Sequence, residues 1–217
     1  MKLRYHLAIV VALCLTFGAL GLSKRQSYTN VTADPSFLKD FYVAEIPSAL
    51  AIEDCQKLKE DLPTAPIILK VSTVNPLEIL FGGRQQKVSI EHVYSGDGLE
   101  NGQEIYITAD HWKVYPSDKT IDAGFVNVMK EGADYLVFLS DCIGTSKDYT
   151  DVYRLQSGRY INPVFRYSSG ENIIFPVSEE STYVPYTEVS NNEFFSVESD
   201  GMQAFLSLKQ EMIELFP

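Results

Sequence analysis

The chain has 217 residues, of which 45% are hydrophobic and 12% aromatic, so it can bury the core of one folded domain. Its 29 Asp and Glu residues outnumber its 18 Lys and Arg residues, which gives a formal net charge of −11. Binding to nucleic acid or to an anionic lipid surface needs clustered basic residues, so this composition argues against both partners.

The N-terminal segment, residues 1–22, has the pattern of a targeting sequence. Lys2 and Arg4 precede sixteen residues, 7–22, without a charged side chain. This length lies between a signal-peptide core and a spanning helix, so a cleaved signal peptide and a membrane anchor through residues 7–22 are both open. In either case the rest of the chain is expected to be extracytoplasmic, anchored in the cell membrane or secreted. Residues 23–46 start with a polar stretch without periodicity and predict a tether.

Residues 47–217 are predicted to form one domain that starts and ends with a helix. In residues 48–62, Ile52, Cys55 and Leu58 recur at helical spacing before Pro63. Residues 199–216 show the same period, with an apolar stripe that includes Phe205. We expect this second helix to pack against the rest of the domain; an exposed helix that binds a partner is the alternative.

Between these helices the period of the hydrophobic pattern changes to two, which is typical of strands. Six segments rich in β-branched and aromatic residues carry this pattern: 66–74, 86–96, 103–110, 133–141, 151–156 and 171–177. No helical pattern separates consecutive segments, which favours antiparallel pairing. The predicted fold is therefore mainly β with flanking helices, with antiparallel strands that form a barrel or a sandwich after an N-terminal membrane segment.

Residues 87–110 contain two of these strands and a polar connector. Gly96, Gly98 and Gly102 punctuate the connector and are expected to allow turns. The inward residues of the two strands are expected to be Val88, Ile90, Ile105 and Ile107. We interpret the stretch as a corner of the β-structure and not as a catalytic or metal site.

The strand before this corner ends in Val-x-x-Gly-Asp at residues 93–97, Gly102 precedes the next strand, and Gly-x-x-Tyr-Leu-Val-Phe-Leu follows at residues 132–139. This pattern resembles bacterial extracytoplasmic proteins with a netrin-like or tissue-inhibitor-of-metalloproteinase-like barrel. The resemblance implies a five-stranded barrel of the oligonucleotide/oligosaccharide-binding (OB-like) type, and it indicates fold far more than function. The inhibitors' N-terminal cysteine has no counterpart here, so their mechanism is not carried over.

Candidates for catalysis are few. Beyond the targeting segment only His92 and His111 are available, and no metal-binding or nucleophile motif surrounds them. Adjacent acids such as Glu53 and Asp54 are expected at the surface. We therefore expect no catalytic residue, no metal ion and no cofactor.

Tyrosines in the second half of the chain are the candidate binding residues, because tyrosine combines apolar area with a hydroxyl group. Tyr160, Tyr167, Tyr183 and Tyr186 lie in Pro/Ser/Gly-rich surroundings. They could form one surface for a peptide or glycan, or they could cover the barrel.

Cys55 and Cys142 are the two cysteines beyond the targeting segment, and an oxidising exterior would allow a disulfide between them. Two separate thiols are the alternative.

The function expected from these features is a non-catalytic, membrane-tethered or secreted domain that binds a protein or cell-envelope partner. An envelope hydrolase or metal-dependent enzyme is one alternative. A structural or assembly protein is another.

Overall fold

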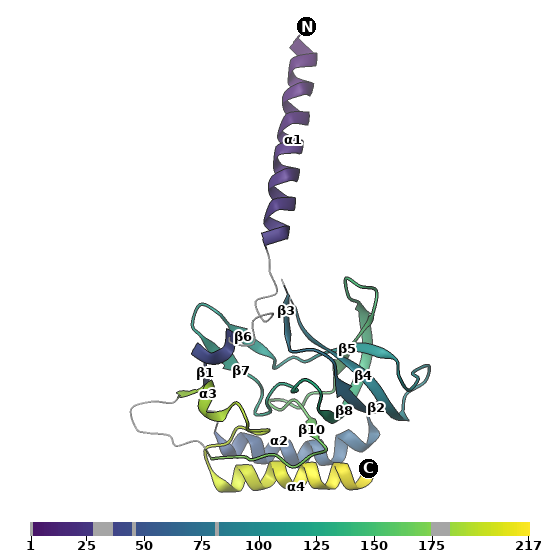
Figure 1. Cartoon of the computed structure of the whole chain (residues 1–217), viewed down its shortest axis with the longest axis vertical. Helices are drawn as coiled ribbons and strands as arrows, with labels where there is room; N and C mark the ends of the chain where they lie inside the picture. Colours follow the sequence, from purple (N-terminus) through teal and green to yellow (C-terminus); the bar gives the residue numbers. More distant parts are fainter. Residues whose placement is uncertain (1, 28–36, 45–46, 81–82, 175–182) are drawn as a thin grey trace.

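The computed structural model describes residues 2–27, 37–44, 47–80, 83–174 and 183–217. Within these ranges a β-barrel and a second, smaller sheet lie above two helices, α2 and α4 (Figure 1). The fold is therefore mixed helix and strand around a barrel.

The barrel is built from β2 (Ile67–Thr73), β4 (Gly83–Ser95), β5 (Glu104–Thr108), β8 (Asp134–Thr145) and β9 (Asp151–Leu155). The strands follow one another in the order β8-β2-β4-β5-β9, and pairing of β9 with β8 closes the barrel. The predicted barrel is thereby confirmed. One pairing departs from the expected antiparallel arrangement, because β9 lies parallel to β5. Two short strands extend the barrel sheet: β3 (Glu78–Leu80) pairs with β4, and β10 (Val164–Arg166) pairs with β8.

The stretch around residues 87–110 is a corner of this barrel, as predicted. Gly96, Gly98 and Gly102 have φ angles of 132°, 77° and 82°, which residues with a side chain rarely adopt. The four residues predicted to face inward are all buried: Val88, Ile90, Ile105 and Ile107.

A second sheet has the strand order β11-β1-β7-β6. Its strands are β1 (Tyr42–Ala44), β6 (Lys113–Tyr115), β7 (Thr120–Asp122) and β11 (Tyr183–Pro185). Each strand turns its middle residue into the core: Val43, Val114, Ile121 and Val184 are buried.

This sheet corrects the predicted boundary between tether and domain. The short helix η1 (Phe37–Asp40) and β1 lie within the segment 23–46 that was expected to be a tether. Phe41 and Val43 are buried in the core, so residues 37–44 belong to the folded domain. Residues 28–36 and 45–46 of the predicted tether lie outside the described residues.

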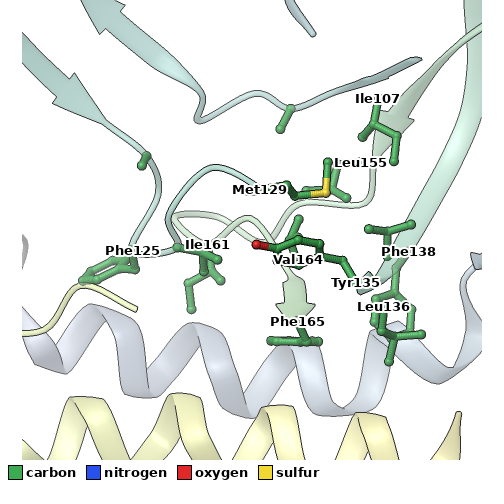
Figure 2. Packing of buried hydrophobic residues seen from close by; sticks show 14 of the residues in the cluster. Ile107, Phe125, Met129, Tyr135, Leu136, Phe138, Leu155, Ile161, Val164 and Phe165 are labelled. Carbon is green, nitrogen blue, oxygen red and sulfur yellow. The ribbon is translucent and has the colours of Figure 1, made fainter. Parts of the chain in front are cut away.

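Helices α2 (Ser48–Asp61) and α4 (Ser199–Leu215) confirm the two predicted helices and lie side by side beneath the barrel (Figure 1). Two shorter helices are η2 (Leu62–Thr64) and α3 (Tyr186–Val189). The rings of Phe205 and Phe194 stack with centroids 5.1 Å apart. The ring of Phe194 in turn packs edge-on against that of Phe165 in β10, with centroids 6.4 Å apart. Figure 2 shows Phe165 and Leu136 nearest to the helices, so aromatic packing joins α4 to the barrel.

The strand predicted at residues 171–177 is absent from its described part, residues 171–174. Side chains replace strand pairing there. Asn192 accepts a hydrogen bond from the backbone of Ile173 and donates one to its carbonyl, while Asn172 accepts bonds from the backbone N–H groups of Glu193 and Phe194. Residues 175–177 lie outside the described residues.

Helix α1 (Lys2–Ser27) contains the uncharged run of the targeting segment. Its residues 10–21 are exposed, and Figure 1 draws the helix apart from the barrel. Within the ranges given above, no helix has both the length and the apolar character that crossing a membrane requires.

Candidate functional site

The four tyrosines proposed as a binding surface lie in different surroundings. Tyr167 and Tyr186 are partly buried and use their hydroxyl groups inside the protein. Tyr160 lies in a loop that is anchored to α2. Tyr183 alone among the four is classed as exposed. The structure therefore does not bring the four together as one surface.

Tyr167 holds the end of the chain against the barrel. Its hydroxyl donates to the carbonyl of Phe216 at 2.7 Å and lies 3.2 Å from the hydroxyl of Tyr94. Lys70 lies 4.3 Å from the centre of the Tyr167 ring. Burial, followed by the hydrogen bond with Tyr94, raises the pKa of Tyr167. These contacts give Tyr167 a structural role.

Tyr186 is also structural. Its hydroxyl donates to Oδ1 of Asn127 at 3.0 Å, and burial raises the pKa of Tyr186 to about 12. Asn127 in turn donates through its amide group to the carbonyls of Ser190 and Asn192, at 3.1 and 2.9 Å. This network fixes α3 and the segment that follows it.

Tyr160 belongs to a loop that Asp54 of α2 fastens to the domain. The Asp54 carboxylate is buried and accepts hydrogen bonds from the backbone N–H groups of Arg159, Tyr160 and Ile161, at 3.0, 2.8 and 3.0 Å. The expectation that Asp54 lies at the surface is therefore wrong. A Cβ atom on Gly158 would come within 2.5 Å of this carboxylate, so the contact requires glycine at position 158.

The exposed tyrosines gather elsewhere, on the outer face of the second sheet. Tyr42, Tyr115 and Tyr183 are 44%, 42% and 49% exposed, and each is the outward neighbour of a buried valine on its strand. We call these three residues the tyrosine face. On this face Tyr42, Thr120, Asp118 and Tyr183 line a hollow of about 350 Å³.

Strand register explains why Tyr42 and Tyr183 line the same hollow. Tyr42 pairs with Pro185 on one side and with Thr120 on the other, and Ala44 pairs with Tyr183. Tyr42 and Tyr183 are therefore diagonal neighbours on adjacent strands, at a Cα separation of roughly 7–8 Å that side chains of this length can bridge.

The turn between β6 and β7 forms the polar side of the hollow. Asp118 donates its backbone N–H to Tyr115, and the carbonyl of Lys119 accepts a hydrogen bond of 2.8 Å from the backbone of Tyr42. Lys119 has a positive φ of 51° at the end of this turn. The turn is thus attached to β1, next to Tyr42.

Charges around the hollow are unevenly matched. Lys119 lies 3.5 Å from Asp40, and Lys113 lies 4.0 Å from Asp122. For Asp118, the described part of the chain supplies no cation within ion-pair distance. Within the described residues, Asp118 therefore places at the rim of the hollow an exposed carboxylate that no ion pair neutralises.

A second hollow, of about 490 Å³, contains the candidate residue His92. It is lined by Lys70, Glu91, His92, Asp134 and Pro217, and the His92 ring contacts that of Tyr94 at 4.6 Å. The described lining residues include two carboxylates but no serine, threonine or cysteine, so they lack the aliphatic hydroxyl or thiol that most often serves as a nucleophile.

His111 is a structural residue. Its Nε2 atom lies 3.2 Å from the carbonyl of Gly158, and its Cβ atom fills the space that a side chain on Gly124 would occupy. In the described residues, no group of three His, Cys, Asp or Glu side chains is arranged to hold a metal ion.

Of the two alternatives for Cys55 and Cys142, the structure shows two separate thiols and no disulfide. Cys55 is buried on α2 and Cys142 is exposed on β8, and both thiols are free. Burial, followed by repulsion from Asp54, raises the pKa of Cys55 to about 12. Cys142 accordingly remains accessible to reagents that do not reach Cys55.

The tyrosine face was not predicted as a unit, although it includes the candidate Tyr183. The alternation Phe41 buried, Tyr42 exposed and Val43 buried is one available signal, but it extends over a few residues of a segment that was expected to be a tether. Tyr115 and Asp118 lie in a polar stretch without a longer period. The face forms only when four distant segments assemble into one sheet.

Comparison with known proteins identifies no relative that would assign this site. No family model matches the chain, and no curated protein matches its sequence.

Proposed function

We propose that this protein is a non-catalytic extracytoplasmic domain that binds a protein or cell-envelope partner through the tyrosine face. The observation that carries the proposal is the exposure of Tyr42, Tyr115 and Tyr183 on one side of one sheet, beside a hollow. Tyrosine is enriched in binding interfaces because its ring supplies contact area while its hydroxyl tolerates water.

The architecture supports an OB-like assignment of the barrel. In chain order its strands are β2, β4, β5, β8 and β9, and the first three form an antiparallel meander while the last joins the third in parallel. The proposed binding surface lies on the added sheet and not on the barrel itself. The domain's acidity favours neutral or basic partners.

The extracytoplasmic location rests on the sequence of residues 1–22. Exposed Cys142 provides a test in a full chain that carries Cys14→Ser. A membrane-impermeant maleimide added to intact cells should label Cys142, with Cys142→Ser as the control. Labelling that appears only after lysis would contradict this location.

Binding can be tested by placing the photocrosslinker p-benzoylphenylalanine at position 115 of the full chain. Tyr115 lies on the tyrosine face but does not line the hollow, so the replacement leaves the hollow intact. The matched control is position 149, where Tyr149 is 89% exposed in the turn between β8 and β9. Illumination of producing cells should give a discrete covalent adduct from position 115 and none from position 149. Equal adducts from both positions, or none from position 115, would refute the proposal.

A further inference from the structure

We propose that the hollow of the tyrosine face binds a small organic cation of the quaternary ammonium class. This inference rests on the proposed binding role of the face and specifies the chemistry of one ligand group. Among the described residues, the lining of the hollow supplies two tyrosine rings and one carboxylate, together with the side chain of a threonine: Tyr42, Tyr183, Asp118 and Thr120.

The aromatic side chains supply the first part of the argument. A quaternary ammonium group is attracted to the negative faces of aromatic rings, and it has no N–H group that would require an acceptor. Tyr42 and Tyr183 are diagonal neighbours on β1 and β11, and both line the same hollow. A methylated cation in the hollow can therefore contact side chains from both strands.

Charge supplies the second part. Asp118 lies at the hollow without a cation from the described residues, whereas neighbouring Asp40 and Asp122 each have a lysine partner. A bound cation would give this carboxylate a counter-charge. The net charge of −11 adds a long-range attraction for cations and repels anions.

A sugar is the alternative ligand, because a sugar ring can stack on tyrosine and its hydroxyl groups can bond to those of Tyr42, Tyr183 and Thr120. Charge favours the cation. Asp118 has no ion-pair partner among the described residues, and a neutral sugar would not supply one.

The test compares choline with 3,3-dimethylbutan-1-ol, a neutral molecule of nearly the same shape, by calorimetric titration of the full chain. We expect choline to bind at least about tenfold more tightly than the neutral analogue, because only choline interacts with the ring quadrupoles and with Asp118 as a charge. Phosphatidylcholine vesicles form a separate arm. Binding to vesicles without binding of free choline would overturn the proposal that the ligand is a small solute.

Three variants locate the binding. Asp118→Asn keeps the size of the side chain, and Tyr42→Leu removes the ring but keeps apolar volume; each should weaken choline binding by about three- to tenfold. Tyr149→Asn removes an exposed tyrosine outside the hollow and should leave choline binding unchanged. Circular dichroism of each variant confirms that it is folded.

Equal affinity for choline and its neutral analogue, or choline binding that survives both Asp118→Asn and Tyr42→Leu, would overturn the inference. Preferential binding of a neutral monosaccharide would also overturn it. The proposed function is tested separately, because the crosslink from position 115 does not require a ligand in the hollow. A crosslinked adduct without choline binding would support the tyrosine face as a binding surface and would refute choline-like cations as its ligand.

Discussion

Replacing Asp54 with asparagine should strongly destabilise the domain, although the two side chains are nearly the same size. The carboxylate uses Oδ2 for the N–H groups of Tyr160 and Ile161, and Oδ1 for the N–H group of Arg159. An asparagine can direct its single oxygen toward Tyr160 and Ile161. Its NH₂ group then faces the N–H donor of Arg159.

The magnitude follows from these three bonds. A hydrogen bond to a charged acceptor contributes about 1.5–3 kcal/mol and a neutral bond about 0.5–1.5 kcal/mol, so each retained bond loses about 1 kcal/mol. The unpaired donor adds a penalty of about 1–3 kcal/mol. The free energy of unfolding should therefore fall by about 3–5 kcal/mol.

Urea denaturation followed by tryptophan fluorescence measures this change, since Trp112 is the only tryptophan of the chain and is buried. Glu53→Gln, on the exposed neighbouring residue, is the control and should change stability by less than about 0.5 kcal/mol. A loss below about 1 kcal/mol for Asp54→Asn would refute the assignment of the carboxylate as the anchor of this loop.

Three further predictions concern stability. Lys209→Met should lower the free energy of unfolding by about 3–5 kcal/mol, because it leaves the buried Glu193 carboxylate without its ion-pair partner at 2.5 Å. Lys59→Met, in an exposed ion pair, is the control and should lower it by at most about 1 kcal/mol. Thermal or urea denaturation measures both changes, and equal losses would contradict the prediction. Tyr149 has a φ of 64°, so Tyr149→Asn should raise the unfolding free energy by about 0.5–1 kcal/mol, and an unchanged or lower melting temperature would count against the strain. Burial raises the pKa of Tyr186 to about 12, so the unfolded tyrosine, with a pKa near about 10, loses its proton first. The stabilisation that Tyr186 contributes below about pH 10 is therefore lost as the pH rises toward about 12. The urea midpoint should fall between about pH 8 and about pH 11, and it should fall further in the unmodified protein than in the Tyr186→Phe variant.

The barrel could be predicted from the sequence because its strands are long enough to show their period. In β2 and β4 the alternation of buried and less buried residues extends over several positions, as in Val88 and Ile90. The parallel contact between β5 and β9 leaves no comparable signal, because the period of a strand does not depend on the direction of its neighbour.

The candidate site was harder to predict for a related reason. Each strand of the second sheet has three residues and turns a single residue, such as Val43 or Ile121, into the core. One inward residue does not define a period.

Asp54 was predicted at the surface for a different reason. The backbone N–H groups that bind its carboxylate lie more than a hundred positions further along the chain, and a pattern of side chains does not indicate backbone hydrogen bonds.

The order of the strands also constrains when the domain can fold during synthesis. The hairpin of β4 and β5 joins nearby residues and can form early. The second edge of β2 stays unpaired until β8 has been made, and the second edge of β5 until β9, which ends at Leu155. The stacked ring of Phe205 arrives later still, with α4. A nascent chain that stops before Leu155 therefore exposes unpaired strand edges, and such a chain is a substrate for chaperones or for aggregation until β9 has been made.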